Sequence, residues 1–255
     1  MAKSKRQIQV EGIRFNQMID IIAARYEKSF RNEIKRSMFE SADYYAKTGF
    51  LRQDILDRHK KNIQKIAMRL YSQSIDSSST RQFETIQKKR NHIKMEKKDA
   101  LDEFERLSVS YILEHGLELS TTVSNTTRKE VQRVLASSIT QGLAVSETVK
   151  ILKDRALISS RNRARLISVT ETHTSASWAN INSTMSIADE VGLELEKVWN
   201  TTEDERTRMS HRFADGQKLG IKEPFTVQGE SLEYPGDQNG SAGNVINCRC
   251  FMTYE

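Results

Sequence analysis

A stripe of apolar residues at helical spacing runs through the first part of the chain. Between Gly12 and Gly49 the sequence contains neither glycine nor proline, and apolar side chains recur at every fourth position. This period places them on one face of an α-helix. The pattern predicts one long amphipathic helix over residues 10–45, on the order of 50 Å in length at about 1.5 Å per residue. Its stripe consists of Met18, Ile22, Tyr26, Phe30, Ile34, Met38 and Ala42.

Further helices are predicted after this one. Apolar periodicity indicates a second helix that ends at the serine-rich segment 72–80, which we interpret as an exposed loop or hinge. A third helix is expected over residues 81–114, and a fourth from Asn125, whose side chain suits a helix N-cap. A short helix and a longer one over residues 160–191 complete the set. The heptad signal is poor, which favours packed antiparallel helices over a continuous coiled coil.

The composition of the chain changes after residue 191. Both prolines, both cysteines and seven of the eleven glycines lie beyond it, where short β-type segments alternate with turns. We therefore expect an α+β fold in which a small antiparallel sheet, with its last strand over residues 246–254, packs against the preceding helix. Two domains are predicted: an extended helical region over residues 1–120, and a C-terminal domain over residues 121–255 that is helical to about residue 191.

Four motifs stand in a set order in the second half of the chain. They are Ala-Arg-Leu-Ile-Ser-Val-Thr-Glu at residues 164–171, a charged segment over residues 204–216 after Trp199, Tyr-Pro-Gly-Asp at residues 234–237, and Asn-Cys-Arg-Cys at residues 247–250. In this order they resemble the C-terminal domain of the phage Mu F-like head morphogenesis proteins, also called minor head or minor capsid proteins. The resemblance covers residues 130–255 and departs from the family pattern at Met209, where a proline is expected.

The resemblance implies a component of a phage or prophage virion that acts in head morphogenesis by binding and has no enzymatic activity. It implies contacts with the portal protein, the major capsid protein or the scaffold. It also implies a place in the head interior or at the portal vertex, after assembly in the host cytoplasm. Within the shared domain it assigns a structural role to the motif residues Glu171, Asp204, Arg206, Arg208, Gly216 and Asn247.

Two cysteines and a histidine in the C-terminal region form a candidate metal site. Cys248 and Cys250 are separated by one residue, so an extended strand would place both thiols on one face. A tetrahedral zinc site would take these thiols together with His211 and either Asp215 or His173. The paired CxxC spacing of common structural zinc sites is absent from the sequence. Buried reduced cysteines without a cofactor are therefore the favoured interpretation, and a structural zinc is the alternative.

Other polar clusters raise an enzymatic alternative. Glu171 and His173 lie on a polar part of the predicted helix, and a dense charge cluster follows at residues 203–208. A metal-dependent nuclease or a toxin-like transferase would use such groups, or His211 and Asp215 with the two cysteines. The sequence specifies no nucleophile beside them. We therefore favour a polar helix surface that packs on the C-terminal module, and an ion-pair network that holds the loop.

The net charge of +6 is distributed unevenly along the chain. Residues 1–100 carry +11 and the remaining residues carry −5. A basic half can face nucleic acid, but its basic residues alternate with acids, which favours a solvated helix surface. A DNA-binding internal head protein is a further alternative, with weak and sequence-independent binding to phosphates expected. The densest basic segment holds Lys88, Lys89, Arg90, Lys94, Lys97 and Lys98.

Hydropathy indicates no membrane association. No apolar run approaches the ~18 residues that a membrane-spanning helix needs. The N-terminal residues also lack the apolar stretch of a secretory signal. We therefore expect an intracellular, soluble protein.

Overall fold

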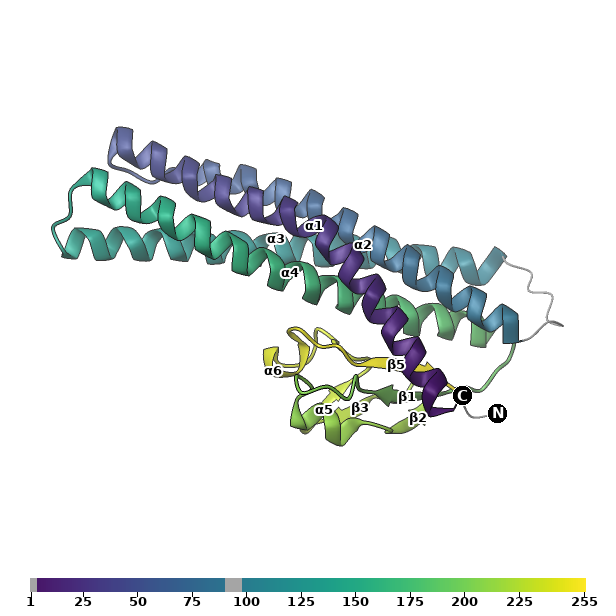
Figure 1. Cartoon of the computed structure of the whole chain (residues 1–255). Coiled ribbons are helices and arrows are strands. Elements are labelled where there is room, and N and C mark those ends of the chain that lie inside the picture. The colour runs from purple at the N-terminus through teal and green to yellow at the C-terminus, as the bar shows by residue number, and fades with distance from the viewer. Residues whose placement is uncertain (1–3, 90–97) are drawn as a thin grey trace. The chain divides into compact units, whose positions relative to one another are not determined.

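The computed structural model describes residues 4–89 and 98–255 of the chain (Figure 1). In this part of the chain four long helices precede a set of short strands and helices. The helices are α1 (Lys5–Thr48), α2 (Gln53–Lys89), α3 (Lys98–Thr140) and α4 (Val145–Glu190). The short elements are β1 (Glu196–Asn200), α5 (Met209–Ala214), β2 (Lys218–Gly220), β3 (Phe225–Val227), β4 (Glu230–Leu232), α6 (Ala242–Val245) and β5 (Phe251–Tyr254). The predicted α+β class is confirmed, with helices up to residue 190 and strands only beyond it.

The serine-rich segment 72–80 is helical, so the prediction of an exposed loop there is wrong. It lies within α2, and several of its serines are buried. The Ser74 hydroxyl lies 2.6 Å from the hydroxyl of Ser175, and the Ser78 hydroxyl donates a hydrogen bond of 2.7 Å to the carbonyl of Ala176. Small hydroxyl side chains let α2 and α4 approach closely while each hydroxyl keeps a partner. Polarity alone therefore misidentified a buried helix face.

Three other predicted helix boundaries are also wrong. Asn125, expected as an N-cap, lies inside α3, and the short helix expected after Gly142 continues without a break into the helix expected from residue 160. Arg81, expected to begin a helix, lies inside α2. Local capping residues are tolerated inside a helix when tertiary packing stabilises the whole length. The long helices consequently depend on their buried faces more than on their local sequence.

The described residues form two compact units, and each unit is assembled from separate segments of the chain. Unit 1 comprises the described residues of 1–23, 71–110 and 169–255, and unit 2 comprises residues 24–70 and 111–168. The predicted boundary between residues 120 and 121 falls inside α3, within unit 2.

Unit 2 is a purely helical body with an apolar core. Met38 and Ala42, from the predicted stripe of α1, are completely buried against α3 and α4. The side chains that meet them include Val131, Val134, Leu135, Leu152 and Ala156. A buried polar pair accompanies this core, because Nδ1 of His59 lies 2.6 Å from a carboxylate oxygen of Glu33.

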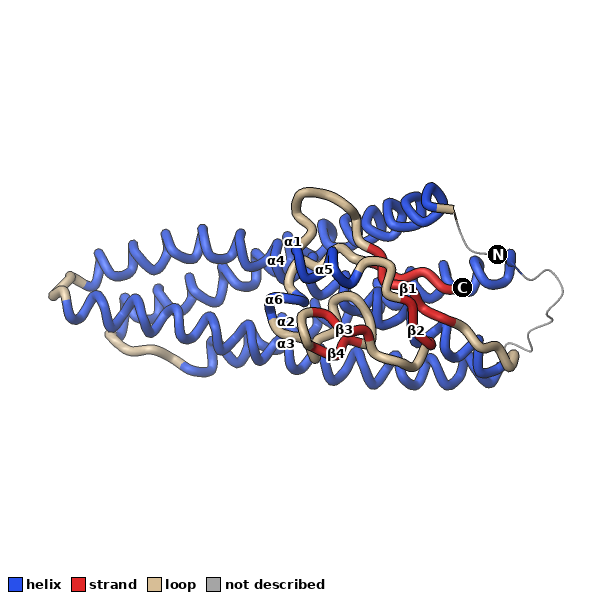
Figure 2. The backbone as a smooth tube through the Cα atoms, turned by 90° about the horizontal axis from the view of Figure 1, so that it is seen from below, coloured by secondary structure: helices blue, strands red, loops and turns tan. Residues whose placement is uncertain are grey.

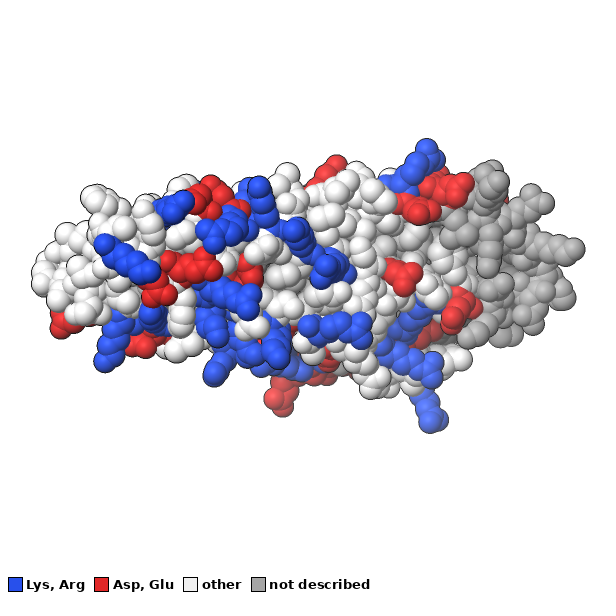
Figure 3. Space-filling model, turned by 90° about the horizontal axis from the view of Figure 1, so that it is seen from above, with Lys and Arg blue, Asp and Glu red and all other residues white. Residues whose placement is uncertain are grey.

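Charged side chains cover the outside of the helices with both signs mixed. On the face drawn in Figure 3, Lys and Arg lie among Asp and Glu. Unit 2 has exposed ion pairs such as Lys153 with Asp43 at 2.6 Å and Arg58 with Glu40 at 3.1 Å.

Within the predicted DNA-contact segment, Arg90, Lys94 and Lys97 lie outside the described residues, as do the side chains of Lys88, Lys89 and Lys98. DNA contact by that segment therefore stays a prediction. No helix in the described part of the chain is both long and apolar enough to cross a membrane.

Unit 1 contains the two small sheets, whose strands are drawn in Figure 2. In the first sheet β1 lies between β2 and β5 and is antiparallel to both, with Val198 opposite Lys218 and Trp199 opposite Met252. The second sheet is the β3–β4 hairpin, which pairs Phe225 with Leu232. Side chains from both sheets meet in one apolar core around the completely buried Trp199.

The N-terminal turns of α1 pack directly on the last strand. Phe15 and Ile19 form a buried cluster with Phe251 of β5 and Ala176 of α4. A Cβ atom added to Gly12 would lie only 2.3 Å from the Phe251 ring. Glycine is thus the residue that lets the helix backbone reach this ring. The sequence contained no local signal for this approach.

Unit 1 also buries a lysine. Lys197 on β1 is 1% exposed, and its Nζ donates a hydrogen bond of 2.8 Å to the carbonyl of Glu233 and lies 4.8 Å from the centre of the Phe225 ring. Burial lowers the pKa of Lys197 to about 8, although the nearby carboxylates of Glu233, Asp237 and Glu223 raise it.

Gly12→Ala is expected to destabilise unit 1. Alanine normally favours a helix interior over glycine by about 1 kcal/mol, but here its methyl group would clash with a ring that is itself buried. Overpacking of this kind costs about 1–3 kcal/mol. Both tryptophans of the chain lie in unit 1, so denaturant unfolding followed by tryptophan fluorescence measures the change. Gly243→Ala is the control within unit 1, because its new Cβ would lie 3.6 Å from its nearest neighbour, the hydroxyl of Ser241. A Gly12→Ala protein as stable as wild type would contradict the tight packing.

Lys197 is expected to make unit 1 more stable as the pH rises above about 8. The unfolded lysine, with its pKa of about 10.4, binds more protons than the folded one between these two values. Stability therefore rises with pH, by about 2 kcal/mol between roughly pH 8 and pH 9.5. Lys197→Met should lose this rise in unfolding experiments followed by tryptophan fluorescence, whereas Lys222→Met, at an exposed position, should keep it. The same slope in all three proteins would show that Lys197 is not the titrating group.

Candidate functional site

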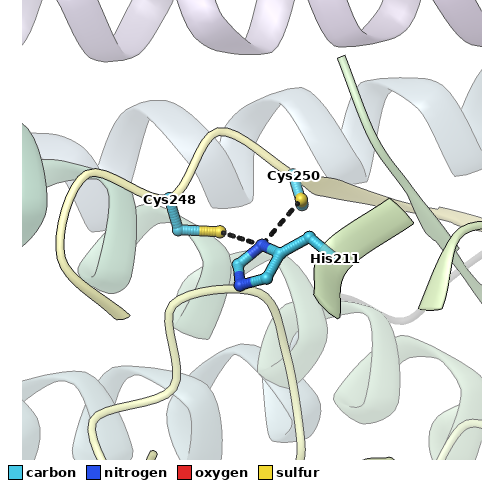
Figure 4. Close-up of side chains that lie close together, drawn as sticks. All are labelled: His211, Cys248 and Cys250. Atoms are coloured by element: carbon cyan, nitrogen blue, oxygen red, sulfur yellow. Dashed lines mark hydrogen bonds between the residues drawn. The ribbon is translucent and has the colours of Figure 1, made fainter. Parts of the chain in front are cut away.

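Three buried side chains that bind metals in other proteins converge in unit 1. They are His211 on α5 and the two cysteines, Cys248 and Cys250, which lie between α6 and β5 (Figure 4). Nδ1 of His211 lies 3.3 Å from Sγ of Cys250 and 3.7 Å from Sγ of Cys248. The three ligand atoms all lie within 4.8 Å of one another, and none of the residues is more than 3% exposed.

A turn, rather than the pleat of a strand, positions the two cysteines. The strand expected over residues 246–254 is present only as β5, which begins at Phe251 after both thiols, so that prediction is wrong for the first five residues. The backbone of Asn247 is left-handed, with a φ of 55°, and its N–H donates a hydrogen bond of 3.2 Å to the hydroxyl of Thr170 on α4. The N–H of Cys248 then bonds to the carbonyl of Val245 at 3.1 Å. Both thiols point inward because of this turn.

α4 holds the segment from its polar face. Nε2 of His173 donates a hydrogen bond of 2.8 Å to the carbonyl oxygen of Cys250. The hydroxyl of Thr174 donates one of 2.9 Å to the carbonyl of Gly236. Glu171 accepts a hydrogen bond of 2.5 Å from the hydroxyl of Tyr71 on α2. His173 and Glu171, weighed as catalytic groups, thus each make a hydrogen bond within unit 1, His173 to the cysteine segment and Glu171 to α2.

The loop between β1 and α5 carries the charge cluster of residues 203–208. The Asp204 carboxylate accepts hydrogen bonds of 3.1 Å from the backbone N–H of Arg206 and from the hydroxyl of Thr207, and it also pairs with Arg249. Burial raises the pKa of Asp204, but the hydrogen bonds from Arg249 and Thr207 and the charges of Arg249 and Arg206 together outweigh it, so the pKa lies below its usual value. Arg208 donates to the carbonyl of Ile246. These contacts join the loop to the cysteine segment on both sides.

Asp215 lies outside the cluster that the structure shows for His211, Cys248 and Cys250. One of its carboxylate oxygens accepts a hydrogen bond of 2.6 Å from the backbone N–H of Thr201. Gly216 follows it in a left-handed conformation, and its N–H bonds to the carbonyl of Trp199 at 2.8 Å. Asp215 and Gly216 thus terminate α5 and return the chain to the sheet, which fixes the position of His211.

The two thiols differ in acidity because they are coupled. Burial raises the pKa of Cys248, but hydrogen bonds with Cys250 and His211 outweigh it, so its pKa is well below its usual value. The hydrogen bond with Cys248, together with burial, raises the pKa of Cys250 well above its usual value. Both cysteines are free. The arrangement can hold one thiolate beside an imidazole nitrogen, either as a hydrogen-bonded group or as part of a ligand set for a soft cation.

Several residues that build the site had no signal in the sequence strong enough to identify them. Trp199 lies edge to face with His211, with ring centres 5.7 Å apart. Asn16 on α1 donates a hydrogen bond of 3.3 Å to the carbonyl of Arg249. Asn tolerates the left-handed backbone better than most residues, so Asn247 was the one local indication of a turn.

Comparison with known proteins gives the same family as the sequence motifs. The family described as phage Mu protein F like protein matches residues 129–253. The minor head protein GP7 of Bacillus phage SPP1 is 30% identical over 131 residues, which cover 50% of this chain and 42% of that protein. The NAD(+)–arginine ADP-ribosyltransferase EFV of Enterococcus faecalis is 38% identical over 63 residues, 25% of this chain and 13% of the transferase. This chain thus matches less than half the length of either relative. No solved structure matches.

The matched region contains α4, both sheets, the three metal-binding side chains and the charged loop that borders them. The match to the minor head protein covers 50% of this chain, and the match to the transferase covers 25% of it. Over residues 129–253, this chain matches the family of phage Mu protein F like proteins, and its similarity to a minor head protein points to the same family.

Proposed function

We propose that this chain acts in phage head morphogenesis as a minor head protein that binds the portal protein or the inner surface of the capsid. The observation that carries the proposal is the family match over residues 129–253, together with the relative that is itself a minor head protein. The proposed place of action is the head interior or the portal vertex. DNA contact through the basic segment near residue 90 is a secondary part of the proposal and rests on charge alone.

Exposed apolar side chains support an action by binding. On α3, Leu113 and Leu117 lie one helical turn apart, and each is 51% exposed. On α5, Phe213 is 83% exposed, and Met209 lies four residues before it. Large apolar side chains that remain in water are available to be buried by a partner. We assign the α3 pair to a helical docking surface and the α5 pair to a second contact surface on the C-terminal module.

Burial of the polar cluster also favours binding over catalysis. His211, Cys248 and Cys250 are almost completely enclosed, whereas a catalytic group has to reach its substrate. The likeness to the ADP-ribosyltransferase covers 13% of that enzyme. Such a short match indicates that the two proteins share one segment. Transferase chemistry is therefore not part of the proposal.

Incorporation into heads tests the proposal. The full chain would be produced together with the portal, major capsid and scaffold proteins of a phage genome that encodes it, and the particles would be separated by sedimentation. Wild-type protein is expected in the particles. Leu113→Ser with Leu117→Ser should reduce incorporation about tenfold or more, since a loss of about 1.4 kcal/mol already weakens binding tenfold. Ile158→Ser, at another exposed apolar position on α4, is the matched control and should be incorporated normally.

Two outcomes would count against the proposal at different levels. Wild-type protein that stays out of every particle would contradict a role as a head component. The α3 double variant would first be confirmed as folded by circular dichroism. If it is incorporated normally, the assignment of a docking surface on α3 is wrong, and Phe213 and Met209 remain as the proposed contact. The corresponding Phe213→Ser variant then shows whether α5 makes that contact.

A further inference from the structure

We propose that His211, Cys248 and Cys250 bind one zinc ion, which joins α5 to the segment in front of β5. The ligand atoms are Nδ1 of the histidine and the two Sγ atoms. This inference is independent of the binding partners proposed above, since it concerns only groups inside unit 1.

The distances fit a shared tetrahedral ion. With Zn–S bonds of about 2.3 Å and Zn–N bonds of about 2.0 Å, tetrahedral ligands place nitrogen and sulfur roughly 3.5 Å apart. The observed separations from Nδ1 of His211 are 3.3 Å to Cys250 and 3.7 Å to Cys248. The two nitrogen-to-sulfur separations therefore match those of a shared zinc ion, and the two sulfur atoms lie within 4.8 Å of each other, close enough for small side-chain movements to bring both to one ion.

Hydrogen bonding alone satisfies this arrangement poorly. An imidazole nitrogen offers either one proton or one lone pair, directed in the plane of the ring. Nδ1 of His211 nevertheless faces two sulfur atoms at once, as Figure 4 shows. A cation placed between the three atoms binds each of them along its own lone pair. Thiolate and imidazole are also the donors that zinc prefers.

The surroundings suit a structural ion. The site lies in the apolar core that includes Trp199 and Ala214, so bulk water and competing ligands are largely excluded and only a single enclosed water molecule has to be accommodated. The carbonyl of Cys250 is held by His173, and the N–H of Asn247 by Thr170, which fixes the backbone on both sides of the thiols. Outer contacts of this kind orient metal ligands. The ion would link positions 37 and 39 residues apart in the sequence.

Three protein ligands leave one coordination position. Asp215 does not take it, because its carboxylate lies outside the group of ligand atoms that are within 4.8 Å of one another, and its Oδ1 accepts a hydrogen bond from the backbone of Thr201. We assign the fourth position to a water molecule, as in other three-ligand zinc sites. Asp215→Asn should accordingly keep the zinc.

Metal analysis of the purified full chain tests the proposal. Protein produced with added zinc is expected to contain about one zinc per chain, because such sites bind zinc tightly at neutral pH. Cobalt exchanged into the site should show the absorption of thiolate-to-cobalt charge transfer. Cys248→Ser, Cys250→Ser and His211→Asn should each lower the zinc content about tenfold or more. His115→Asn, which changes a histidine of unit 2, is the control and should keep the zinc.

A second measurement covers variants that fail to fold. Removal of zinc from the wild-type protein by a chelator should lower the unfolding temperature reported by tryptophan fluorescence, and added zinc, but not magnesium, should restore it. Folded wild-type protein without zinc, without a cobalt spectrum and with two reduced buried thiols would overturn the proposal. Retention of zinc by folded Cys248→Ser would also overturn it, and loss of zinc from Asp215→Asn would overturn the three-ligand set.

Discussion

The binding of residues 247–254 to the rest of unit 1 is the constraint on which this structure depends. The segment from Asn247 to Tyr254 pairs with β1 along its strand, and side chains of α4 bond to its backbone at Asn247 and Cys250. At its far end the hydroxyl of Tyr254 donates a hydrogen bond of 2.5 Å to Asn180. The segment is thus held by β1 and by α4. The central position of β1 and the core around Trp199 depend on it.

This constraint also explains the polar face of α4. A helix that carries Thr170, His173 and Thr174 in the interior would normally be destabilised by buried polar groups. Each of these side chains instead bonds to the backbone of a turn or strand end. The hydrogen bonds satisfy the irregular backbone that faces the helix and use both threonine hydroxyls and Nε2 of His173, whereas the buried Nδ1 of His173 has no hydrogen-bond partner among the described residues. The C-terminal module can therefore be rich in turns and still be closely packed.

The sequence predicted the parts of this fold that local patterns determine. The α1 stripe, the end of the helices near residue 190 and the change to strands were correct, because periodicity and the distribution of glycine and proline report them directly. The buried serines of α2 were misjudged, since a hydroxyl has the same local signature in water and against another helix. The approach of Gly12 to Phe251 joins residues more than two hundred positions apart, and no local pattern reports such a contact.

The candidate site was predictable only as a set of residue types. Cysteine and histidine were recognised as donors from their identity, but the prediction relied on the pleat of a strand to align the thiols. The left-handed turn at Asn247 performs that alignment instead. The position of His211 depends on how α5 follows β1, which is set by tertiary contacts such as the bond between Asp215 and Thr201. Spacing in the sequence therefore indicated the chemistry without giving the geometry.

Hydrogen exchange of the full chain, followed by mass spectrometry, tests the central role of the terminal segment most directly. Exchange of an amide requires the opening of the structure that protects it, so its rate reports the stability of that structure. If the segment holds unit 1 together, the amides of β5 should exchange as slowly as those of β1 and of the α4 region around His173. Fast exchange in β5 while β1 and α4 remain protected would contradict this account.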